Sequence, residues 1–148
     1  MLAPLPDTTP GSILKPGAIW NQQNMTMVLQ NPKFAGTSCG AIFEFDVSLK
    51  NNEPIEITVD VRGKDLSVSD DQGKPYLVFY KLGERSSVCG EYSSLENLHL
   101  IALGPGGNVT LAMRVTGQFD GNIKKYVFTA VKAGRIQNAR WEIPVPPR

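Results

Sequence analysis

Residues 41–50 have the sequence Ala-Ile-Phe-Glu-Phe-Asp-Val-Ser-Leu-Lys, in which apolar residues occupy every second position from Ala41 to Leu49. Successive side chains of a β-strand point to opposite faces of a sheet, so this period of two predicts a strand with one face on a core and the other in water. The same alternation recurs at residues 55–61 and 109–115. The chain is therefore expected to be built from half-buried strands.

Further segments are rich in β-branched and aromatic residues, and they complete a set of about eight candidate strands. These segments are residues 25–29, 76–82, 98–103, 126–132 and 137–143. Turn-forming Asn, Asp, Gly and Pro separate many of them, as at residues 51–54, 70–73, 104–107 and 120–122. Only residues 93–98 resemble a helical turn. The pattern predicts an all-β fold, a single antiparallel jelly-roll β-sandwich of about eight strands with extended terminal arms.

The length of 148 residues is that of one domain, and no internal repeat or shift of composition divides it. Four prolines within residues 1–17 predict an extended N-terminal arm. Residues 18–143 are assigned to the jelly-roll domain. Residues 144–148, Pro-Val-Pro-Pro-Arg, are assigned to a proline-rich C-terminal tail of polyproline character. We expect both ends to contact neighbouring subunits.

The cellular setting is read from hydropathy and cysteine usage. No apolar run is long enough to span a bilayer, so no membrane partner is expected. The first residues lack the basic and apolar regions of a secretory signal, although a cleaved signal could already have been removed. Cys39 and Cys89 permit one disulfide, but two buried free thiols are favoured for a chain without a signal.

The residues needed for common catalytic and metal sites are scarce. His99 is the only histidine, and its apolar surroundings at residues 98–101 favour a structural role. One histidine and two distant cysteines leave a transition-metal site short of ligands, and no nucleophile-elbow, phosphate-loop or zincin motif occurs. The carboxylates considered for calcium are read instead as solvated loop residues: Asp60, Asp65, Asp70 and Asp71. We expect no enzyme activity, no cofactor and no metal.

Charge is distributed unevenly along the chain. Residues 1–113 contain 8 Lys or Arg and 12 Asp or Glu, whereas residues 114–148 contain 7 and 2. This basic C-terminal quarter is expected either to face phosphate or an acidic partner or to be the solvated side of two strands. Lys124, Lys125 and Lys132 are its candidates for nonspecific contact with RNA.

One resemblance goes beyond these physical arguments. Residues 57–63, Ile-Thr-Val-Asp-Val-Arg-Gly, are followed by a polar loop to Asp71-Gln72-Gly73 and then by Leu-Val-Phe-Tyr at residues 77–80. This order resembles the small coat protein of comoviruses, which belong to the picorna-like plant viruses (secovirids). Residues 109–117, 126–130 and 135–147 resemble the last three strands and the proline-terminated tail of that family.

The resemblance implies a structural coat protein subunit that assembles with sister jelly-roll proteins into an icosahedral shell around RNA. Its partners would be other coat subunits, in homo- and hetero-oligomeric contacts, and genomic RNA bound without sequence preference. Its location would be the virion, and the host cytoplasm during assembly. The residues predicted to face an interface or RNA are Trp20, Met25, Arg62, Tyr92, Lys124, Lys125 and Lys132.

Two other classes of protein stay open. A carbohydrate-binding β-sandwich module would use exposed aromatic rings as a flat stacking platform, with Trp20, Tyr76, Tyr92 and Trp141 as the candidates. A trimeric, cytokine-like jelly roll is the third hypothesis, and the missing signal peptide disfavours it.

Overall fold

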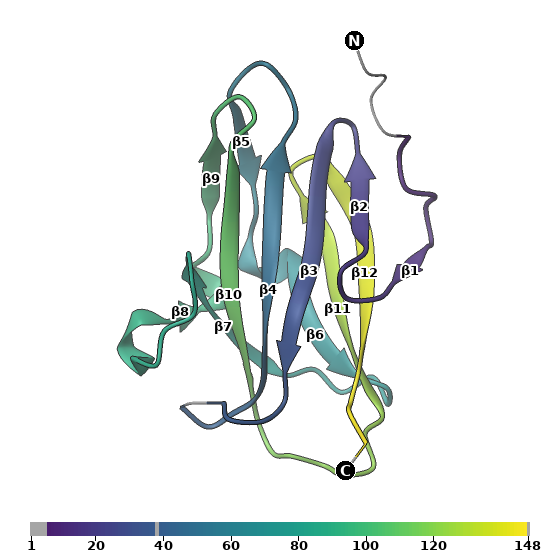
Figure 1. The fold of residues 1–148 in the computed structure, drawn as a ribbon, viewed down its shortest axis with the longest axis vertical. Helices are drawn as coiled ribbons and strands as arrows, with labels where there is room; N and C mark the ends of the chain where they lie inside the picture. The colour runs from purple at the N-terminus through teal and green to yellow at the C-terminus, as the bar shows by residue number, and fades with distance from the viewer. Residues whose placement is uncertain (1–5, 38, 148) are drawn as a thin grey trace.

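The computed structural model describes residues 6–37 and 39–147, and it is an all-β sandwich with a separate two-stranded ribbon beside it (Figure 1). One sheet has six strands in the order β2 (Ile19–Gln22), β3 (Met25–Lys33), β4 (Ala41–Asn51), β10 (Asn108–Thr116), β7 (Leu77–Leu82) and β8 (Ser93–Ser94). The other has four, in the order β1 (Ile13–Leu14), β12 (Ile136–Pro144), β11 (Lys125–Ala133) and β6 (Leu66–Asp70). The ribbon pairs β5 (Ile57–Asp60) with β9 (Leu100–Leu103).

All eight predicted strand segments are strands in the structure, and the all-β class is confirmed. The alternation at residues 41–49 is also confirmed, since alternate residues of β4 are buried. The prediction missed the short strands β1, β2, β6 and β8. Three 3₁₀ turns connect strands: η1 (Gly63–Asp65), η2 (Cys89–Glu91) and η3 (Leu95–Asn97), the last within the predicted helical turn.

The core lies between the two sheets and is built from large side chains. Phe45 of β4 packs its ring against Phe128 of β11 with centroids 5.5 Å apart, and Phe128 lies 6.0 Å from Trp141 of β12. Two large apolar strand residues, Ile57 and Phe79, are only partly buried. Phe79 points to the outer side of its sheet because its neighbours along β7 take the inner positions, and it pairs with Arg114 of β10.

Residues 6–17, the described part of the predicted N-terminal arm, lie against their own domain. Strand β1 pairs with β12, in parallel. Thr8 donates its backbone N–H to the carbonyl of Asn21 at 2.7 Å, and its hydroxyl accepts the Asn21 N–H at 2.8 Å. The indole of Trp141 donates to the Ala18 carbonyl at 3.0 Å. Residues 1–5 of the predicted arm lie outside the described residues.

The first residues of the C-terminal tail also lie against their own domain, as residues 6–17 do. Pro144 still belongs to β12, and the Val145 N–H donates to the Lys124 carbonyl at 2.8 Å.

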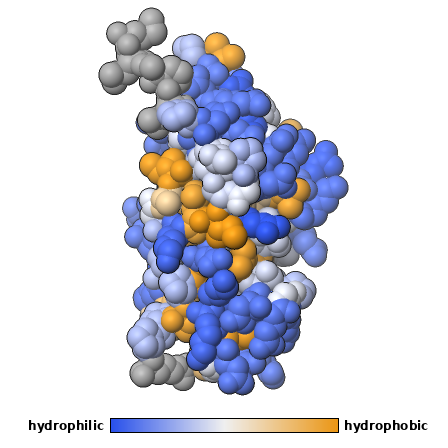
Figure 2. All heavy atoms as spheres, turned by 90° about the vertical axis from the view of Figure 1, so that its right-hand side faces the viewer, coloured by the Kyte–Doolittle hydropathy of each residue, from blue (hydrophilic) through white to orange (hydrophobic). Residues whose placement is uncertain are grey.

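Figure 2 views the side that carries β1 and shows apolar atoms at mid-height bordered by hydrophilic ones. The strands on this side contribute the exposed Ile13 and Ile19. In the described part of the chain, no helix has the length and apolar character needed to cross a bilayer.

Candidate functional site

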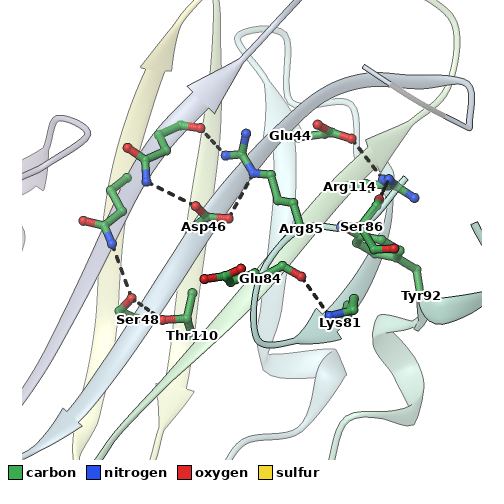
Figure 3. A network of polar contacts seen from close by, with 12 residues as sticks. Glu44, Asp46, Ser48, Lys81, Glu84, Arg85, Ser86, Tyr92, Thr110 and Arg114 are labelled. Carbon is green, nitrogen blue, oxygen red and sulfur yellow. Dashed lines mark hydrogen bonds and ion pairs between the residues drawn. The ribbon is translucent and has the colours of Figure 1, made fainter. Parts of the chain in front are cut away.

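The outer face of the six-stranded sheet carries a polar network (Figure 3). Because alternate residues of β4 enter the core, Glu44, Asp46 and Ser48 face outward. Strand β10 pairs with β4 so that Arg114 lies opposite Glu44 and Thr110 opposite Ser48. The hydroxyls of Ser48 and Thr110 are 3.0 Å apart and share a hydrogen bond.

One part of this network is a buried ion pair. The Nε of Arg114 donates to Oε1 of Glu44 at 3.0 Å, and the two side chains are only 4% and 6% exposed. The guanidinium also lies 3.7 Å from the ring centroid of Tyr92 and donates to the Ser86 carbonyl. Buried charges are stable only when they are paired and hydrogen-bonded. The cation–π contact with Tyr92 further stabilises the guanidinium. The Tyr92 ring is therefore already occupied by a cation of its own chain.

The cover of this ion pair is the loop between β7 and β8, residues 83–92. Arg85 of this loop donates to Asp46 at 3.1 Å and to the Asn31 carbonyl. Lys81 donates through its ammonium to the Glu84 carbonyl at 2.8 Å. The loop is thus tied to β3, β4 and β7 by charged side chains.

A disulfide between Cys39 and Cys89 makes the same connection covalently. The prediction of two buried free thiols is therefore wrong on both counts, since the cysteines are bonded and both residues are exposed. The pairing of β4 with β10 and of β10 with β7 brings the β3–β4 loop beside the β7–β8 loop, although the cysteines are 50 residues apart. This proximity exists only in the assembled sheet.

Two surface grooves are lined by charged side chains. The first, of about 680 Å³, runs beside the β7–β8 loop and presents amide, hydroxyl, carboxylate and guanidinium groups. Its lining residues are Asn31, Asp46, Gly83, Glu84, Arg85, Asn108, Val109 and Thr110. None of these is aromatic, so the groove can offer hydrogen bonds to a polar surface but no stacking platform.

The second groove, of about 850 Å³, lies where η1 meets β9, and it brings two predicted site residues together. Arg62 lines it and bonds Oδ1 of Asp60 at 3.4 Å, while Lys132 approaches Oδ2 of the same carboxylate at 3.6 Å. His99 stands on the wall of this groove and is exposed, immediately before β9. Lys64 and Glu96 add one charge of each sign, so the groove has no strong preference for anions or cations.

The prediction that Trp20 and Met25 face a partner is wrong. Trp20 is 2% exposed, its ring lies 6.4 Å from that of Trp141, and its indole donates to the side chain of Gln22 at 3.1 Å. Met25 is fully buried. Both belong to the core because β2 and β3 form a hairpin that covers one end of it.

The basic C-terminal quarter is largely neutralised within the molecule. Of its six Lys and Arg residues in the described part of the chain, four form ion pairs, three of them with acidic residues from the first 113 positions. Those pairs are Arg114–Glu44, Lys132–Asp60, Arg135–Glu53 and Lys125–Glu142. The hydrogen bond from Arg135 lowers the pKa of Glu53. Lys124 is exposed, and its backbone N–H donates to Asp71 at 3.0 Å.

Two of the four rings proposed as a stacking platform for a carbohydrate-binding module lie in the core. Trp20 and Trp141 are buried. Tyr76 is partly buried and donates its hydroxyl to Asp70 at 2.8 Å, and the face of Tyr92 is covered by Arg114.

Asp70 is a structural carboxylate and not the solvated loop residue that was predicted. It is 4% exposed and accepts hydrogen bonds from the backbone of Gln72 and Lys74 and from the Tyr76 hydroxyl. Burial by itself raises the pKa of Asp70, but the hydrogen bonds outweigh it and lower the pKa below the ordinary value. Burial and the bond to Asp70 raise the pKa of Tyr76. Within the described residues, no three His, Cys, Asp or Glu side chains are grouped to hold a metal ion.

The chain matches no family model and no curated protein. It is similar to the crystal structure of the yjhA protein from Bacillus subtilis, with a TM-score of 0.53 and 11% identity over 90% of this chain and 100% of that one. It is also similar to an uncharacterized β-sandwich protein from Clostridium difficile, with a TM-score of 0.50 and 8% identity over 96% of this chain and 100% of that one. At such identities the likeness concerns the fold alone, and it agrees with the β-sandwich class.

Proposed function

We propose that this protein is a non-catalytic β-sandwich domain that works in an oxidising compartment, where its loops and sheet edges contact a macromolecular partner. The observation that carries the proposal is the exposed Cys39–Cys89 disulfide. Disulfides persist in secreted, periplasmic and surface proteins, and the reducing cytosol removes them. The disulfide lies outside the core that the two sheets enclose. It fixes the β7–β8 loop, whose charged side chains already bind the six-stranded sheet.

The two surface grooves fit a binding function better than a catalytic one. Two charged side chains of the groove beside the β7–β8 loop, Arg85 and Asp46, are engaged with each other. A general base or nucleophile needs a poised partner within hydrogen-bond reach of the reacting atom. In the described grooves, His99 has no cysteine or serine beside it among the lining residues.

The test is the redox state of the protein taken from its natural source. The chain is trapped with an alkylating reagent during lysis, and its mass is compared before and after treatment with a dithiol reductant. We expect Cys39 and Cys89 to be alkylated only after reduction. Alkylation of both cysteines in the untreated chain would overturn the proposal.

The coat-protein hypothesis is a second proposal, supported by the β-sandwich architecture and by the resemblance in the sequence. Virion surfaces are among the settings where disulfides persist. The jelly-roll topology and the icosahedral role belong to this proposal, and consecutive pairing such as β2–β3–β4 and β11–β12 is not specific to it. Electron microscopy of the oxidised chain with its sister proteins should show closed shells, and a chain that stays free of particles contradicts the idea.

RNA contact within such a shell would depend most on Lys124. Lys125 and Lys132 already pair with Glu142 and Asp60, so phosphate would compete with these carboxylates. Lys124→Gln should therefore lower the salt dependence of RNA binding by about one unit of log–log slope, and Lys125→Gln by less. Equal effects of both variants would show that the ion pair between Lys125 and Glu142 breaks readily when RNA binds.

A further inference from the structure

Strand β9 is a four-residue edge strand that lacks three of the usual protections, a charge, a proline and a bulge. Within the described residues it pairs with β5 only, and it diverges from β10 beyond the turn at residues 104–107 (Figure 1). In an antiparallel pair, alternate residues turn their N–H and C=O groups away from the partner strand. The outer edge of β9 thus offers backbone donors and acceptors to another strand.

The sequence of β9 favours such an addition. It reads Leu-Ile-Ala-Leu and contains no charge, no proline and no bulge, the devices by which edge strands normally avoid pairing. Ile101 and Leu103 face the core side, while Leu100 and Ala102 face solvent, with Leu100 65% exposed. An apolar, uncharged strand of this kind can pair with a copy of itself without like charges meeting.

The ribbon also gains from the addition. It has two strands of four residues each, with Val59 and Leu103 in the core, and further paired strands would add backbone hydrogen bonds to it. A peptide would add one strand, but a second copy of the chain adds both its β9 and its β5. The four-stranded order β5-β9-β9-β5 follows directly from an antiparallel pairing of the two β9 strands about a two-fold axis.

We propose that two copies of this chain associate through antiparallel pairing of their β9 edges. With Ile101 on the two-fold axis, Leu100 lies opposite the partner's Ala102 on the solvent side. The core-facing side chains of the two β9 strands then also form one continuous row, because opposite residues of an antiparallel pair share a face. The inference is independent of the oxidising compartment and of the coat-protein proposal.

The experiment compares Leu100→Lys with Leu77→Lys by sedimentation velocity of the oxidised full chain. The two leucines are matched, since both lie on strands and are 65% and 69% exposed, but Leu77 lies on β7. We expect the wild type and Leu77→Lys to dimerise alike and Leu100→Lys to weaken dimerisation at least tenfold. Circular dichroism confirms that each variant is folded. Hydrogen exchange at residues 100–102 should slow as the wild-type concentration rises.

A third variant, Ile19→Lys, tests the side of the molecule seen in Figure 2. Loss of the dimer in this variant, with Leu100→Lys unaffected, would overturn the proposal by locating the interface at β2. A wild-type chain that stays monomeric at millimolar concentration would also overturn it, as would equal losses in Leu100→Lys and Leu77→Lys.

Discussion

Gly63 shows how one residue position can fix a local structure. A Cβ built on Gly63 would lie 1.9 Å from the carbonyl oxygen of Leu95, because η1 and η3 pack backbone against backbone. Close packing therefore explains the glycine of the Val-Arg-Gly stretch at residues 61–63, which is part of the resemblance in the sequence.

Replacing Gly63 with alanine should lower the free energy of unfolding by about 2–3 kcal/mol, the cost of forcing extra volume into a packed site. Gly104→Ala is the matched control, since nothing lies within 4 Å of its added Cβ. Urea unfolding of both variants measures the difference. Equal stability of the two variants would mean that η1 and η3 separate at little cost.

Asp70 gives a prediction about pH. Its pKa in the folded chain lies below the unfolded value, so its stabilising contribution is complete above the unfolded pKa, about 3.9, and is lost as the pH falls through the folded pKa. Asp70→Asn should lose about 1–3 kcal/mol at pH 7, where it removes a charged acceptor of three hydrogen bonds. The gap from the wild type should narrow below pH 4.

Urea unfolding at pH 7, 5 and 3 measures this gap. Asp120→Asn is the control, because Asp120 makes a similar bond to the Asn122 N–H on an exposed turn. A gap of constant size across the range would show that the charge of Asp70 is not what stabilises the turn.

The Glu44–Arg114 pair predicts strong non-additivity. Arg114→Met leaves the Glu44 carboxylate buried without its partner and should cost about 3–5 kcal/mol, whereas the double variant Glu44→Leu/Arg114→Met should recover part of that loss. A double-mutant cycle from chemical unfolding gives the coupling energy. Additive losses would mean that water reaches the carboxylate as soon as the arginine is removed.

At the scale of elements, the decisive connection is between the β3–β4 loop and the β7–β8 loop. Their disulfide closes a long stretch of chain, with the cysteines 50 residues apart. Loss of loop entropy in the unfolded chain then stabilises the fold by about 4 kcal/mol.

The double variant Cys39→Ser/Cys89→Ser should therefore unfold at lower urea but remain a β-sandwich, because both cysteines lie outside the core. Hydrogen exchange should accelerate first at residues 83–92. The outcome against this prediction is a variant that has lost its β-sheet circular dichroism signal, which would make the bond a condition of folding.

At the scale of the whole molecule, the two sheets pack against each other through buried aromatic side chains. Phe45→Ala and Phe128→Ala each remove a fully buried ring that contacts the opposite sheet and should cost about 3–5 kcal/mol. Phe119→Ala, at a ring that is 47% exposed, is the control. Thermal unfolding compares the three, and a loss below about 1 kcal/mol at Phe45 would remove it from the core.

The sequence by itself determined the strands that alternate cleanly and the buried face of β4, because a period of two follows from strand geometry alone. It missed β6, whose Leu-Ser-Val-Ser-Asp stands between charged turns and resembles a loop. It also placed Trp20 at an interface, since a tryptophan near a predicted arm carries no local sign of being covered by β12.

The candidate site was decided by tertiary structure. The pairs Cys39–Cys89, Glu44–Arg114 and Asp60–Lys132 each join positions at least 50 residues apart, and no local pattern marks them. The same long-range pairing cancels much of the charge asymmetry that the sequence displays. Local periodicity is set by backbone geometry within a few residues, whereas partners across sheets are set by strand order, which a single sequence does not reveal.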